Sequence, residues 1–168
     1  GLGELYHWSH PEAVAKDPIL TWKKGYLNTG FFIGRAAFYF VLWSAMAFFF
    51  RKNSVAQDAN GDETLSFKMR KLAPISTLTF ALTISFAGFD WLMSLDPHWF
   101  STIFGLCMFA GAMVSCYATL SLSGLWLTKN GQLTNTIGVA NLHDTGKMMF
   151  GFLVFWTYVS FSQYYLIW

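Results

Sequence analysis

The chain has 168 residues, of which 54% are hydrophobic, 20% are aromatic and only 12% are charged. Soluble domains carry about 25% charged residues, so this composition predicts an integral membrane protein. The formal net charge is +2. The basic residues lie between apolar runs rather than in a stripe with aromatic residues, which argues against a nucleic-acid partner and favours lipid.

The chain begins with Gly1 and ends at Trp168 inside an apolar run. We therefore expect it to be a piece of a longer, multi-pass membrane protein. Residues 1–28 are mixed in polarity and contain Trp8 and Trp22. Tryptophan is enriched where membrane meets water, so we expect this stretch to be a periplasmic interfacial segment rather than a domain.

Four apolar runs follow, at 29–50, 73–95, 100–127 and 148–168. Each has about 20 residues or more, the length that a helix needs to cross a hydrocarbon core of about 30 Å. The fold class predicted for residues 29–168 is therefore an all-α transmembrane domain of four helices. Polar connections, including the turn-forming Asn60-Gly61-Asp62 and the helix-stopping Asp96-Pro97-His98, predict antiparallel neighbours.

The distribution of lysine and arginine predicts the orientation. The connections after the first and third runs hold Arg51, Lys52, Lys68, Arg70, Lys71, Lys129 and Lys147, and the opposite side holds Lys16, Lys23 and Lys24. Cytoplasmic loops carry the excess of positive residues, so we expect loop 51–72 to be cytoplasmic and the Asp96–Trp99 turn to be periplasmic.

Small residues predict where helices pack. Gly111, Ser115, Thr119 and Ser123 recur every four residues, and Gly30 with Gly34 forms a shorter version of the same pattern. Helices in lipid associate through such small-residue faces, so we interpret both patterns as packing surfaces.

Two further small side chains, Cys107 and Cys116, are nine residues apart and should lie on opposite sides of their helix. We therefore predict no metal site and no disulfide there.

Arg35 and Asp90 are the charged residues within the first two apolar runs. A charge at membrane depth costs at least about 2.5 kcal/mol. Both lie about two turns from the expected periplasmic end, so we expect the side chains to meet. Two interpretations stay open: an ion pair that locks two helices together, or a proton-binding carboxylate tuned by the arginine.

A line of hydroxyl groups leads towards Asp90. Helical spacing places Ser76, Thr79 and Thr83 on a path from the cytoplasmic end of the second helix. These groups could carry protons. The alternative is that the hydroxyls bond to carbonyls of their own helix or to a neighbouring helix.

The fourth helix begins near a second group of titratable residues, His143, Asp144 and Lys147. Asp144 or Thr145 could cap the helix, Lys147 could reach lipid phosphate, and His143 beside Asp144 could take protons from the cytoplasm.

Polar residues on the expected periplasmic side supply candidates for a quinone-side pocket: His98, Trp99, Tyr158 and Gln163.

Several motifs resemble those of a known family. They are FDWLMSLDPHWFSTIFG at 89–105, HDTGK at 143–147, FWTY at 155–158 and FSQYYLIW at 161–168. The chain resembles the ActF subunits of bacterial alternative complex III, which are NrfD-like membrane proteins, and the likeness spans the whole chain.

This resemblance implies a bundle of about ten helices in the bacterial inner membrane, within a complex that oxidises menaquinol or ubiquinol and reduces a periplasmic carrier. Iron–sulfur clusters and haem c would belong to partner subunits, and a homologous NrfD-like sister subunit would lie in the same complex. No cofactor other than a quinone is expected on this chain. Three roles remain open: a quinol-binding subunit, a proton-conducting subunit and a structural membrane anchor.

Overall fold

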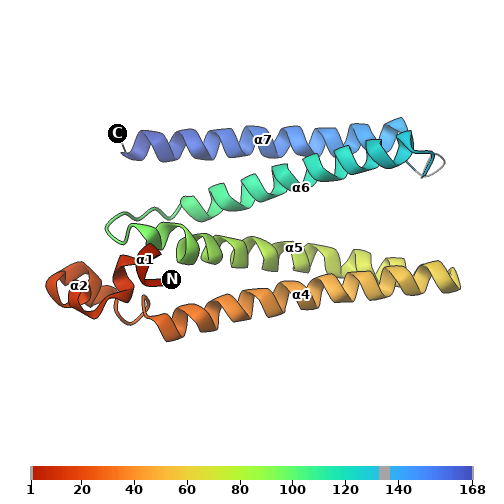
Figure 1. Cartoon of the computed structure of the whole chain (residues 1–168). Coiled ribbons are helices and arrows are strands. Elements are labelled where there is room, and N and C mark those ends of the chain that lie inside the picture. Colours follow the sequence, from red (N-terminus) through yellow and green to blue (C-terminus); the bar gives the residue numbers. More distant parts are fainter. Residues whose placement is uncertain (1, 133–136, 168) are drawn as a thin grey trace. The chain divides into compact units, whose positions relative to one another are not determined.

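The computed structural model describes residues 2–132 and 137–167, and within these ranges the ordered elements are all helices (Figure 1). The chain divides into two compact units, Gly1–Phe100 and Ser101–Trp168. The all-α fold class is confirmed.

The N-terminal segment folds into short helices: α1 (Leu2–Leu5), the 3₁₀ helix η1 (His7–Ser9), α2 (Pro11–Lys16) and α3 (Pro18–Lys23). Pro11 and Pro18 each begin a helix, a position where the missing N–H of proline has no consequence. A small core of Trp8, Leu20, Leu27 and Phe32 joins these helices to the next one. The indole of Trp8 also donates to the Ser94 carbonyl at 3.1 Å, which ties the segment to the chain after α5.

The first long hairpin consists of α4 (Thr29–Asn60) and α5 (Glu63–Trp91). Contacts run in opposite order along the two helices, from Tyr39 with Asp90 to Gln57 with Ser66, so the helices are antiparallel as predicted.

The prediction of a polar loop over 51–72 was wrong, because only Gly61 and Asp62 separate the helices. Gly61 ends α4 with φ of 64°, and the side chain of Asp62 caps α5 by accepting from Thr64 N. The predicted turn is thus present, but the polar residues around it are helical. Lysine, arginine, glutamine and alanine are strong helix formers, so the helices continue where the apolar run stops.

The other predicted helix ends also need correction. The second helix was expected to reach Leu95, but α5 ends at Trp91 and a 3₁₀ helix, η2 (Met93–Leu95), follows. The third was expected to start at residue 100, but α6 covers Phe104–Lys129. Asp96-Pro97 fixes an extended turn between these elements, because proline disfavours a helical conformation for the residue before it.

The second unit is a hairpin of α6 and α7 (Val139–Ile167). The contacts again run in opposite order, from Ser101 with Gln163 to Tyr117 with Phe152. Gly111 lies at the interface, where a Cβ atom would meet the Trp156 indole at 3.3 Å. A small residue is therefore required at this point of the α6–α7 contact.

The rest of the small-residue pattern does not pack within the described chain. Ser115, Thr119 and Ser123 are exposed, and a Cβ atom on Gly34 would meet no atom within 4 Å. Of the predicted packing surfaces, only Gly111 contacts a neighbouring helix here.

The start of α7 differs from the prediction as well. The helix begins at Val139, so Asp144 and Thr145 lie inside it and cannot cap it. The Thr145 hydroxyl instead donates to the Asn141 carbonyl at 2.8 Å, one turn earlier. The apolar run begins at residue 148, whereas the helix starts earlier, which is why hydropathy misplaced the helix start.

Three helical stretches are long and apolar enough to cross a membrane: Thr29–Asn60, Glu63–Leu95 and Phe104–Lys129. Residues 148–167 of the fourth predicted run lie within α7, and its last residue, Trp168, lies outside the described residues. This helix is long enough to cross a membrane but is less apolar over its second half. That half contains Thr157, Tyr158, Ser160, Ser162, Gln163, Tyr164 and Tyr165. These features indicate a membrane protein.

Candidate functional site

The buried carboxylate of Asp90 is the centre of the most polar cluster between α4 and α5. Asp90 is 0% exposed and lies in the last turn of α5, closer to the helix end than predicted. Its Oδ2 accepts from Arg35 Nε and from the Tyr39 hydroxyl, both at 2.8 Å, and its Oδ1 accepts from the Tyr26 hydroxyl at 2.8 Å. The predicted contact between Arg35 and Asp90 is therefore present.

Arg35 is held on several sides. Its Nη1 donates to the Tyr26 carbonyl at 3.1 Å. Its guanidinium carbon lies 3.9 Å from the ring centroid of Tyr26 and 4.2 Å from that of Phe31. Aromatic faces attract a cation, so these contacts fix the guanidinium beside the carboxylate.

A separate polar contact joins α4 and α5 farther along the hairpin, at Thr83. Trp43 Nε1 donates to the Thr83 hydroxyl at 2.9 Å, and this hydroxyl donates to the Thr79 carbonyl at 2.8 Å. The Thr79 hydroxyl likewise donates to Ile75 O, and Ser76 is half-buried on the same helix. The hydroxyls of Thr79 and Thr83 thus bond to their own backbone, the arrangement that the alternative interpretation described.

Sequence reasoning missed Tyr26, Tyr39 and Trp43. Tyr39 and Trp43 follow Arg35 at intervals of four residues, so helical spacing could have placed them on the same face. Tyr26 precedes α4 and had no periodic signal. Burial, followed by the hydrogen bond to Asp90, raises the pKa of Tyr26 to about 12.

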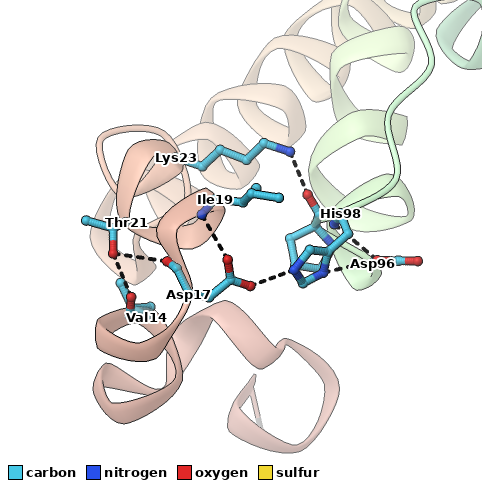
Figure 2. A network of polar contacts seen from close by, with 8 residues as sticks. Val14, Asp17, Ile19, Thr21, Lys23, Asp96 and His98 are labelled. Carbon is cyan, nitrogen blue, oxygen red and sulfur yellow. Dashed lines mark hydrogen bonds and ion pairs between the residues drawn. The ribbon is translucent and has the colours of Figure 1, made fainter.

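The turn after α5 forms a second polar network with α3 (Figure 2). His98 Nε2 lies 2.6 Å from Asp17 Oδ2, and Lys23 Nζ donates to the Pro97 carbonyl at 2.5 Å. A hydrogen bond from the Ile19 amide, with a smaller contribution from His98, lowers the pKa of Asp17.

Two of the quinone-side candidates lie in this region, and they line neighbouring cavities. His98 lines an apolar cavity of about 720 Å³ with Trp22 and Phe100. Trp99 lines one of about 260 Å³ that also borders on Trp22.

The other candidates lie in the second unit. Gln163 Oε1 accepts from the Ser101 hydroxyl at 2.6 Å, and Tyr158 is exposed on α7. The four predicted quinone-side residues therefore divide between the two units, with His98 and Trp99 in the first and Tyr158 and Gln163 in the second.

The predicted proton-uptake group also lies in the second unit. His143, Asp144 and Lys147 are all exposed near the start of α7, and Lys147 Nζ lies 3.2 Å from Asp144 Oδ1. These side chains form an exposed polar group on the first turns of the helix.

The two cysteines are free, with Cys107 facing Ser160 at 3.3 Å and Cys116 exposed. Their placement on different sides of α6 agrees with the prediction. Among the described residues, no group of three or more histidine, cysteine, aspartate or glutamate side chains could hold a metal ion.

The chain matches no protein-family model, and a search of curated proteins finds no significant match.

Proposed function

We propose that this chain is a membrane subunit of a bacterial respiratory complex of the alternative complex III type, which oxidises quinol. The proposal includes four membrane spans, with α7 as the fourth, in a larger NrfD-like bundle of about ten helices in the inner membrane. Iron–sulfur and cytochrome c subunits would supply the redox centres. The motif at 89–105 supports the proposed family, because this stretch carries the resemblance and contains both Asp90 and the Asp96-Pro97-His98 turn.

Within such a complex, the geometry favours a structural role for the Asp90 cluster. The observation that carries this proposal is the set of three donors on Asp90: Arg35, Tyr26 and Tyr39 each reach the carboxylate at 2.8 Å. A buried ion pair whose carboxylate accepts further hydrogen bonds holds two helices in one register. We infer that the cluster fixes α5 against α4 so that the membrane arm can anchor the redox subunits.

A second role, proton handling at Asp90, is favoured by one specific contact. Tyr26 is 40% exposed and its hydroxyl donates to Asp90. A hydrogen-bonded route therefore connects the buried carboxylate with the exterior at one end of the hairpin. The rest of the proposed path would need the hydroxyls of Thr79 and Thr83 to leave their present carbonyl partners and to relay protons, with Ser76, through water.

Isolation of the complex tests the proposal. The full-length protein, tagged in its native host and extracted in mild detergent, should retain haem c absorbance, iron–sulfur electron-spin signals and quinol:cytochrome c oxidoreductase activity. A tagged, unrelated multi-span protein from the same membranes serves as the control. Isolation of an intact, folded chain without haem, iron or quinol activity would contradict the proposal.

A further inference from the structure

A histidine between two carboxylates connects the N-terminal segment to the turn that follows α5. His98 Nε2 lies 2.6 Å from Asp17 Oδ2, and its Nδ1 lies 3.8 Å from Asp96 Oδ1 (Figure 2). The His98 side chain is 53% exposed, so bulk protons can reach it.

We propose that Asp17, Asp96 and His98 form a pH-sensitive latch that holds α3 more firmly against the Asp96–His98 turn when His98 is protonated. A neutral imidazole has one N–H and can donate to only one of the carboxylates. The imidazolium always carries an N–H on Nε2, which donates to Asp17, and its charge is attracted by both Asp17 and Asp96. Protonation therefore strengthens the connection between the two segments.

The charged groups around His98 support a stronger connection when this histidine is protonated. Asp17 approaches from the link between α2 and α3, and Asp96 approaches from the turn itself. Lys23 of α3 also contacts this turn, and its Nζ donates to the Pro97 carbonyl at 2.5 Å. Two carboxylates from two different segments therefore face the imidazole and attract its charge once it is protonated.

The latch also has a defined structural consequence. Pro18, Ile19 and Trp22 of α3 line the 720 Å³ cavity together with His98 and Phe100. The contact between Asp17 and His98 joins the residue that precedes α3 to one of the residues that line this cavity. Loosening the latch would let α3 move away and widen the cavity.

This inference does not depend on the proposed respiratory role, and hydrogen exchange tests it directly. The full-length protein in lipid nanodiscs is compared at pH 5.5 and pH 8.0, the range in which histidines ordinarily titrate. After correction for chemical exchange, backbone amides of residues 19–24 should exchange about two- to fivefold more slowly at the lower pH, as expected for an exposed ion pair.

Three variants make the test specific. His98→Gln keeps a hydrogen-bonding side chain but cannot titrate, so the pH effect should disappear. His143→Gln changes an exposed histidine that lies next to Asp144 in the sequence, and it should keep the full effect. Asp17→Asn retains a good helix cap while removing the charge, and it should also reduce the effect. Equal protection of the wild type at both pH values, or an undiminished effect in His98→Gln, would overturn the latch.

Discussion

Arg35 and Tyr39 lie one turn apart on α4 and donate to the same carboxylate oxygen, Oδ2 of Asp90, each at 2.8 Å. A single oxygen of α5 is thus fixed by two neighbouring positions of α4. This arrangement defines both the rotation and the register of the hairpin, and it yields the first two predictions.

The first prediction concerns the charge pair. Asp90→Asn leaves Arg35 without its partner, and an unpaired buried charge typically costs about 3–5 kcal/mol, so assembly should fall sharply. The double variant Arg35→Gln with Asp90→Asn should recover assembly, because neutral amides can still form hydrogen bonds. Assembly is measured as the yield of intact complex.

The same double variant distinguishes the two roles proposed for Asp90. A structural cluster predicts wild-type quinol-driven proton translocation in reconstituted vesicles. Impaired translocation in a fully assembled double variant would instead establish a proton-handling role.

The second prediction concerns Tyr39. Tyr39→Phe removes one donor from a buried carboxylate, and a hydrogen bond to a charged group contributes about 1.5–3 kcal/mol. The thermal midpoint of the detergent-solubilised protein should fall accordingly. Tyr158→Phe, a matched change at an exposed tyrosine of α7, should leave the midpoint unchanged. Equal midpoints for all three proteins would show that Tyr39 contributes nothing.

The third prediction is a pH dependence. The pKa of Tyr26 is raised from 10.0 to about 12, so its neutral form stabilises the fold fully below about pH 10, and this contribution is lost as the pH rises through about 12. The difference in phenolate absorbance between wild type and Tyr26→Phe should therefore titrate near pH 12. A difference curve centred at pH 10 would contradict the contact with Asp90.

The fourth prediction tests the close approach of α6 and α7. Gly111→Leu places a side chain where a Cβ atom would already lie 3.3 Å from the Trp156 indole, so the hairpin should be destabilised. Gly151→Leu is the matched control on α7, because a Cβ atom there meets nothing within 4 Å. Resistance to thermal aggregation in detergent is the measurement, and similar losses in the two variants would contradict a specific contact at Gly111.

The fifth prediction concerns orientation. In a background without Cys107 and Cys116, Lys16→Cys and Asn60→Cys introduce exposed thiols at opposite ends of the first hairpin. The excess of positive residues near position 60 predicts that an impermeant reagent outside spheroplasts labels only position 16. Lysed cells should show labelling at both, and the reverse pattern in intact spheroplasts would invert the topology.

The sequence correctly predicted one turn and one contact between helices. The turn-forming Asn60-Gly61-Asp62 predicted the turn, and the matching depths of Arg35 and Asp90 predicted their contact. It failed at the helix ends, because hydropathy marks where a helix is apolar rather than where its backbone hydrogen bonds stop. It also missed Tyr26 and the contact between Asp17 and His98, which depend on how a non-periodic segment folds back on the hairpin.

The two-residue turn at Gly61-Asp62 has a mechanical consequence. A helix of 32 residues is about 48 Å long, whereas the hydrocarbon core is about 30 Å thick. Because α4 and α5 continue together to this turn, roughly 18 Å of the hairpin would extend beyond the hydrocarbon core as a stiff, charged post. A force applied to its tip would be transmitted along both helices to the membrane, whereas a flexible loop would absorb it.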